Sequence, residues 1–76
     1  MNYESFKKIF EEKHVLKFKL YSLEYIIEPS ENGVVIYPII YNKRKSYYNS
    51  FDELFNNYTV YNESIIYSIN RITIIN

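Results

Sequence analysis

The spacing of the hydrophobic residues changes after residue 13, and this change limits what the chain can fold into. Between residues 3 and 13 large apolar side chains recur every three or four positions, which places them on one face of an α-helix. Asn2, a favoured N-cap residue, precedes this segment. From residue 15 onward apolar and polar residues alternate, as in strands with one buried face. The chain must therefore combine a helix, expected over residues 3–13, with a sheet.

The first two strands are expected to form a hairpin. Residues 15–21 and 23–28 both alternate, and the connection between them at Tyr21 and Ser22 is short. Lysines on the first strand and glutamates on the second are suited to face one another across the pair. This arrangement favours antiparallel pairing.

A turn and a third strand come next. Residues 29–33 end in Asn32-Gly33, a pair that tolerates the positive φ angles of tight hairpins. Residues 34–41 are apolar at nearly every position, which predicts a strand that is central or covered on both faces. Pro38 interrupts this segment and cannot donate to a ladder, so it indicates a sheet edge or a bulge.

The second half of the chain begins with a basic connector over residues 42–46, and Tyr47 and Tyr48 after it are compatible with the end of another short strand. Ser50, followed three residues later by Glu53, has the spacing of a capping box and predicts a short helix over residues 51–57.

Residues 63–70 carry isoleucines at helical spacing and are expected to form a last helix, although alternation also allows a strand there. A terminal strand is expected over residues 72–75. The element order is then α-β-β-β-α-α-β. The sequence therefore predicts an α+β fold, a small antiparallel sheet with helices packed on one face, as a single domain over residues 1–76.

Composition excludes several classes of protein. A disordered chain is poor in aromatic and β-branched residues, whereas 20% of these 76 residues are aromatic. Without cysteine there is no disulfide and no cysteine-based zinc site, so the core must come from aliphatic and aromatic packing, alone or completed by a partner or a second copy. The charged N-terminus lacks the pattern of a secretory signal, and no apolar stretch is long enough to span a membrane. We expect a cytoplasmic protein with no membrane association.

The formal net charge is zero, with nine basic and nine acidic side chains. General duplex-binding proteins are basic, and proteins that mimic DNA are strongly acidic, so neither class fits. The abundance of Ile, Asn, Tyr and Lys indicates an AT-rich coding genome.

No set of residues favours catalysis. The one histidine, His14, lies where the first helix is expected to end, which suits the helix dipole. Neighbouring carboxylates have simpler interpretations as solvated helix residues, strand residues or a first helical turn, as in Glu11-Glu12, Glu24 with Glu28, and Asp52-Glu53. No metal-ligand spacing is present, and one glycine cannot form a glycine-rich phosphate loop. We therefore expect a protein that is not an enzyme and that holds no metal or cofactor.

A tyrosine-rich basic segment is the best candidate for a binding surface. The basic residues Lys43, Arg44 and Lys45 are flanked by aromatic side chains, and tyrosine is enriched at interface hot spots. The predicted interaction surface consists of Tyr37, Tyr41, Lys43, Arg44, Lys45, Tyr47 and Tyr48. Its expected partner is another protein, or a second copy in a homodimer. The alternative is single-stranded nucleic acid, because cations beside aromatic rings bind phosphates and stack bases.

The segments YNSFDELF at 48–55 and YTVYNESI at 58–65 carry a resemblance. Across residues 15–75 the chain resembles small, largely uncharacterised proteins of low-GC Gram-positive bacteria and their phages or mobile elements. The resemblance implies an α+β fold and no particular site residue. Small mobile-element proteins often regulate a host protein. We predict a non-enzymatic protein-interaction module, a small regulator or inhibitor of a host protein, because the chain has no catalytic set, no net charge, many tyrosines and a small core.

Overall fold

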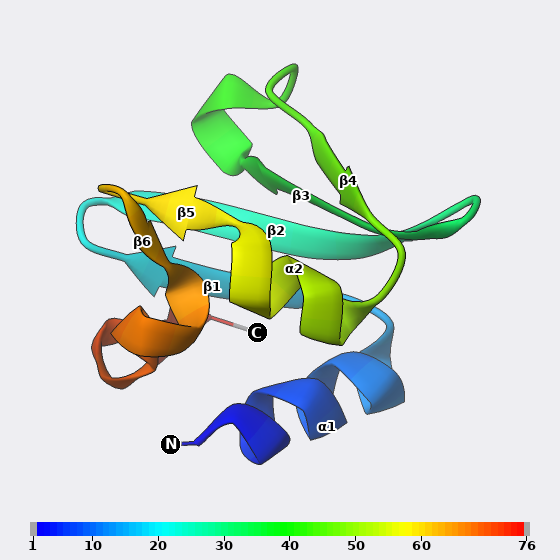
Figure 1. The fold of residues 1–76 in the computed structure, drawn as a ribbon, viewed down its shortest axis with the longest axis horizontal. Coiled ribbons are helices and arrows are strands. Elements are labelled where there is room, and N and C mark those ends of the chain that lie inside the picture. Colours follow the sequence, from blue (N-terminus) through cyan, green and yellow to red (C-terminus); the bar gives the residue numbers. More distant parts are fainter. Residues whose placement is uncertain (1, 76) are drawn as a thin grey trace.

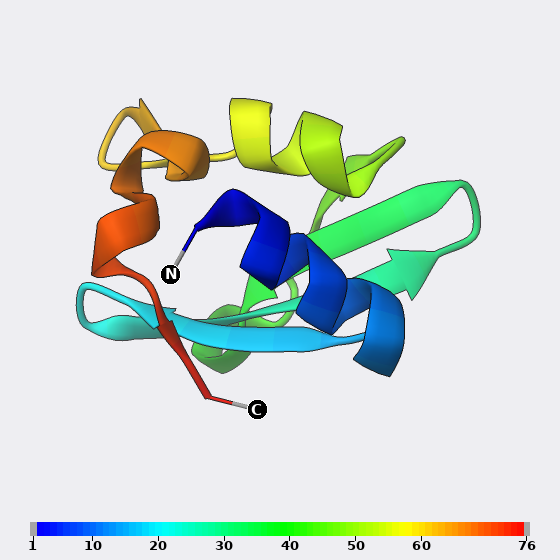
Figure 2. The same cartoon turned by 90° about the horizontal axis from the view of Figure 1, so that it is seen from below.

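The computed structural model describes residues 2–75, in which helices cover one face of a five-stranded antiparallel sheet (Figures 1 and 2). The sheet has the spatial order β4-β3-β2-β1-β7. Its strands are β1 (Leu16–Leu20), β2 (Leu23–Ser30), β3 (Gly33–Pro38), β4 (Ser46–Tyr48) and β7 (Thr73–Ile74). The covering helices are α1 (Tyr3–Lys13), α2 (Phe51–Asn57) and the 3₁₀ helix η2 (Ile65–Arg71). The predicted α+β class and one-sided helix packing are confirmed.

The first helix has the predicted bounds because both of its ends are capped. The Asn2 side chain accepts a hydrogen bond from the backbone N–H of Ser5 at 3.0 Å. At the other end His14 adopts a left-handed conformation, with φ of 60°, and its N–H donates to the Phe10 carbonyl at 2.7 Å.

The second helix also begins and ends where predicted. The Ser50 hydroxyl accepts from the Glu53 N–H at 3.0 Å, which is half of a capping box. The other half differs, because the Glu53 carboxylate accepts from the N–H of Asn49 rather than from that of Ser50. The side-chain amides of Asn56 and Asn57 donate back to the carbonyls of the first turn.

The inner face of the sheet, on the helix side, holds the main core. Alternate residues of β1 point to this face, and Leu16 and Phe18 are fully buried there. Aromatic rings of α1 pack against those of α2, with Phe10 5.0 Å from Phe51 and Tyr3 5.2 Å from Phe55 between ring centroids. The buried cluster comprises Phe6, Leu16, Phe18, Leu20, Tyr25, Ile27, Val34, Ile36, Phe51, Leu54, Phe55 and Ile65.

The third strand ends three residues earlier than predicted, at Pro38. A two-residue turn joins Ser30 to Gly33, and hydrogen-bonded and non-hydrogen-bonded residue pairs then alternate along β2 and β3. Pro29 and Pro38 both fall in non-hydrogen-bonded pairs, so the ladder between β2 and β3 needs no N–H from either proline. The N–H that Pro38 lacks would point toward β4, whose pairing with β3 begins only at Ile36. At that point β3 is a local edge, so the chain leaves the sheet and forms the 3₁₀ turn η1 (Ile39–Tyr41).

The Asn-Gly turn is also different from the prediction. Glu31 and Asn32 occupy the turn, and Gly33 is the first residue of β3. A Cβ atom at Gly33 would lie 2.1 Å from the carbonyl oxygen of Tyr48, because the chain leaving β4 crosses directly over this position. Glycine is therefore required here by a close backbone approach.

The predicted last helix is partly wrong. Glu63 and Ser64 instead form β6, which pairs with β5 (Thr59–Val60) in a separate hairpin. The helical part begins at Ile65 and is 3₁₀ rather than α, in a segment rich in β-branched residues that favour α-helix weakly. The buried Ser68 hydroxyl donates to the Glu63 carboxylate at 2.8 Å, which joins η2 to this hairpin.

Replacing Gly33 by alanine tests whether the backbone of Tyr48 and Asn49 leaves no room for a side chain at this position. We expect Gly33→Ala to lower the free energy of unfolding by about 1–3 kcal/mol, because backbone atoms of residues 48 and 49 must move. Urea unfolding followed by circular dichroism measures this. Glu31→Ala, in the exposed turn, is the matched control and should change stability little; equal effects of the two variants would contradict the assignment.

Tyrosine ionisation should destabilise the fold at high pH. Burial, followed by the nearby Tyr25 and Tyr48, raises the pKa of Tyr58 from 10.0 to about 12. Both states keep this proton below pH 10, whereas between pH 10 and 12 the unfolded chain loses it first, so unfolding becomes more favourable. We expect the free energy of unfolding to fall over this range less steeply in Tyr58→Phe than in the wild type. Parallel curves would refute this.

Candidate interaction surface

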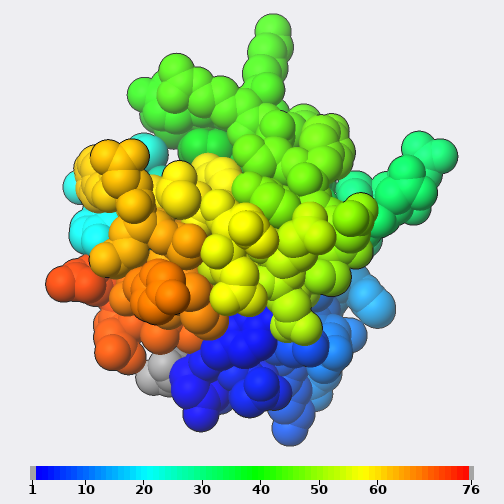
Figure 3. Space-filling model, in the orientation of Figure 1, coloured from blue at the N-terminus to red at the C-terminus, as the bar shows by residue number. Residues whose placement is uncertain are grey.

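The connection between β3 and β4, residues 39–45, forms a projecting arm that we call the η1 arm. Figure 1 shows it above the sheet, at the end of the molecule away from α1, and it protrudes at the top of the space-filling view in Figure 3. The arm closes on itself through the Arg44 N–H, which donates to the Tyr41 carbonyl at 2.9 Å. The Lys45 ammonium donates to the Asn42 carbonyl at 3.0 Å. Both bonds join residues within the arm.

Cations lie over two of the predicted tyrosines. The guanidinium carbon of Arg44 is 4.5 Å from the centroid of the Tyr41 ring. The Lys45 ammonium is 4.8 Å from the centroid of Tyr37. Both distances are those of cation–π contacts, which stabilise exposed side chains by roughly 0.5–1 kcal/mol.

The Tyr37 side chain, on β3, is hydrogen-bonded to the carboxylate of Glu28 on the neighbouring strand β2. The Tyr37 hydroxyl donates to the Glu28 carboxylate at 2.8 Å. This hydrogen bond is the main cause of the raised pKa of Tyr37, with smaller contributions from burial and from the charge of Glu28. Glu28, Tyr37 and Lys45 thus form a chain of contacts from β2 to the arm.

The outer face of the sheet, opposite the α-helices, also buries apolar side chains. Ile26 and Val35 point to this face and are only 8% and 5% exposed, although neither α-helix covers it. The 3₁₀ turn η1 contacts β2 on this side. Tyr37 lies across from Ile26 in the ladder, and Tyr47 lies across from Val35. The tyrosines of the outer face therefore belong to a small second apolar layer.

The arm exposes aliphatic residues that sequence analysis missed. Ile39, Ile40 and Tyr41 are consecutive and all exposed, and Ile40 is 72% exposed. Their apolar character was visible in the sequence, but it was interpreted as the end of a buried strand. The available signal was Pro38, after which the strand could not continue with its full ladder.

Ile40 separates two shallow hollows. One, of about 260 Å³, is lined by Ile40 and by the residues that follow it through Arg44. The other, of about 300 Å³, lies toward the β1–β2 hairpin and includes Lys19 and Glu24. Ile40 is therefore a ridge with cationic side chains on both sides.

The structure brings together most of the predicted surface, but not all of it. Tyr37, Tyr41 and Tyr47 lie with the three basic residues on the arm and the outer face. Tyr48 points to the inner face, where it packs against the main core, and its pKa is raised by burial and secondarily by Glu53. It is separated from the arm because neighbouring strand residues face opposite sides.

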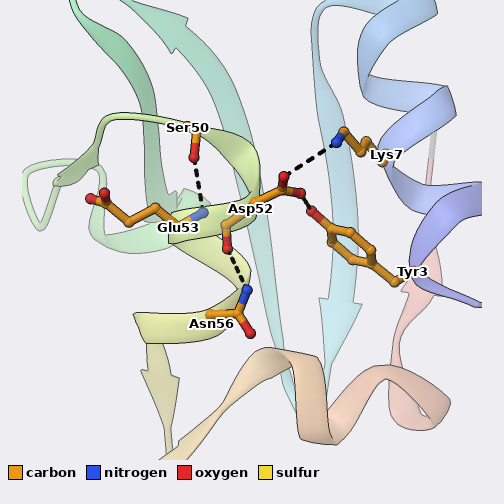
Figure 4. A network of polar contacts seen from close by, with 6 residues as sticks. All are labelled: Tyr3, Lys7, Ser50, Asp52, Glu53 and Asn56. Carbon is orange, nitrogen blue, oxygen red and sulfur yellow. Dashed lines mark hydrogen bonds and ion pairs between the residues drawn. The ribbon is translucent and has the colours of Figure 1, made fainter.

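Polar contacts elsewhere link elements of the fold (Figure 4). The Asp52 carboxylate on α2 accepts a hydrogen bond from the Tyr3 hydroxyl and forms an ion pair of 3.3 Å with Lys7, both on α1. Among residues 2–75 no group of three or more His, Cys, Asp or Glu could hold a metal ion. The contacts of Asp52, Glu53 and Glu28 support a structural role for these carboxylates.

No protein-family model, curated protein or solved structure matches the chain. The resemblance to small proteins of low-GC Gram-positive bacteria therefore stays a prediction. Among residues 2–75 no helix has the length and apolar character needed to cross a membrane.

The anchoring of Tyr37 can be measured through stability. We expect Tyr37→Phe to lower the free energy of unfolding by about 0.5–1.5 kcal/mol, because it removes the bond to Glu28. Tyr47→Phe is the matched control, since this exposed hydroxyl has no hydrogen bond within residues 2–75, and it should be near neutral. Urea unfolding distinguishes the two variants; an equal loss in both would show that the Glu28 contact contributes nothing.

Proposed function

We propose that this protein is a non-enzymatic protein-interaction module that binds a partner protein through the η1 arm. The observation that carries the proposal is the exposure of Ile40 at the ridge of the arm, between two exposed apolar neighbours. Large apolar residues that are exposed together mark interaction sites more often than isolated ones. The arm also offers tyrosine and arginine, the residue types enriched in hot spots.

The contacts within the arm support the same function. The Lys45 ammonium donates to the arm backbone and lies over Tyr37, and the Arg44 guanidinium lies over Tyr41, so both side chains have partners within the protein before binding. Ordering flexible side chains is one of the costs of association, and a preorganised surface avoids part of it. A binding role thus accounts for an apolar ridge that the fold itself leaves uncovered.

Single-stranded nucleic acid is the less favoured alternative. Its support is the proximity of cations and tyrosines. However, Arg44 and Lys45 each occupy a face of a tyrosine ring on which a base would stack. Protein binding needs no free ring face and makes use of Ile40, so we prefer it. The role of a cytoplasmic regulator or inhibitor of a host protein is part of the proposal and rests on the resemblance.

Capture with matched variants tests this function. The tagged 76-residue chain, Ile40→Asp and the control Tyr67→Asp are used as baits in lysate of the source organism. Tyr67 is 76% exposed on η2 and has no place on the arm, so the two substitutions are alike in exposure and charge. We expect one partner in stoichiometric amount with the wild type and with Tyr67→Asp, and its loss with Ile40→Asp.

Circular dichroism confirms that each bait is folded. A wild-type bait that captures no partner would contradict the proposal, and so would a partner that binds Ile40→Asp as well as the wild type.

A further inference from the structure

The charged side chains are distributed unevenly over the molecule, although they sum to zero. The outer face and the η1 arm carry five cations, Lys17, Lys19, Lys43, Arg44 and Lys45. The same region has two carboxylates, Glu24 and Glu28, and Glu28 accepts the Tyr37 hydroxyl. This leaves a formal charge of +3 there and −3 on the rest of the chain.

We infer that the partner of the η1 arm is a protein that presents an acidic segment, with carboxylates next to an apolar side chain. This inference rests on the function proposed above and names the chemistry of the partner. Charge complementarity of this kind speeds encounter and excludes partners of the wrong sign.

The hollow lined by residues 40–44 is the site best suited to a carboxylate of the partner. Its lining includes Ile40 and Tyr41 together with the cations Lys43 and Arg44, and no acidic side chain. The hollow on the other side of Ile40 pairs Lys19 with Glu24, which lie opposite each other in the ladder, so its charge is balanced. An apolar side chain resting on Ile40 would therefore place a neighbouring carboxylate best beside Lys43 and Arg44.

The same charges disfavour a second copy as the occupant. A symmetric dimer uses the same patch on both subunits, so two arms would bring Lys43 and Arg44 of each copy together. An arm against the acidic helix α2 of another copy would be a head-to-tail contact, which forms rings or open chains. Light scattering over a range of concentrations distinguishes these cases; a growing mass would overturn the inference.

Titration with model ligands tests the chemistry directly. The probes are a short synthetic peptide of glutamate and leucine, the same peptide with lysine in place of glutamate, and oligo(dT). Backbone amide shifts of the labelled chain report the site. We expect the acidic peptide at low salt to shift residues 40–44, and the lysine peptide to leave them unchanged. No shift, equal shifts with both peptides, or shifts with oligo(dT) alone would overturn the inference.

Charge reversal adds a control within the chain. Lys43→Glu with Arg44→Glu should weaken binding of the acidic peptide about tenfold or more. Lys8→Glu with Lys13→Glu changes the net charge equally on the exposed side of α1 and should leave binding nearly unchanged. Equal effects of the two double variants would refute a local site.

The two proposals fail in different ways. If the lysate partner depends on Ile40 but binds the Lys43→Glu, Arg44→Glu variant normally, the arm is a docking surface and the acidic partner is wrong. If the wild type captures no partner, the proposed function itself is wrong. A partner that requires both Ile40 and the cations supports both.

Discussion

The rest of the structure depends on the aromatic contact between α1 and α2 over one face of the sheet. Rings from α1 meet rings from α2 at centroid distances of 5.0 to 6.2 Å, and Phe6 and Phe55 are fully buried between these layers. A chain of 76 residues without disulfides depends on such packing for its stability. The packing places both α-helices on the same face of the sheet. The other face of the sheet is stabilised by its own side chains and by η1, which contacts β2 there.

That arrangement links the stability of the outer face to the proposed function. Tyr37 is held by Glu28 from the sheet and by Lys45 from the arm, beside the buried Ile26. The contacts that order this face thus also order the arm. Ile40, which lies on the arm but outside these contacts, is left exposed, and it is the residue through which we propose that a partner binds.

Local patterns predicted the elements whose causes are local. The helix from Tyr3 to Lys13 and the helix from Phe51 to Asn57 were predicted correctly, because their caps and apolar faces lie within a few neighbouring residues. The strand expected to reach residue 41 was wrong, since its end depends on where β4 begins to pair. Gly33 was assigned to a turn, whereas its requirement comes from Tyr48, fifteen positions away in the sequence and in contact only after folding. The candidate surface stays a prediction: the structure groups most of its residues around the arm, but it places Tyr48 on the inner face and exposes Ile39 and Ile40, which sequence analysis did not include.

By itself, the sequence determined the α+β class, the two α-helices and the absence of net charge, because composition and hydrophobic period are properties of the chain alone. Only the tertiary structure decided which tyrosines face the core, which lie by the arm, and that the outer face and the arm together carry a net positive charge. The physical reason is that strand residues alternate between faces. A shift of one residue in strand pairing would exchange Tyr47 with Tyr48, and that pairing is set by contacts between distant segments.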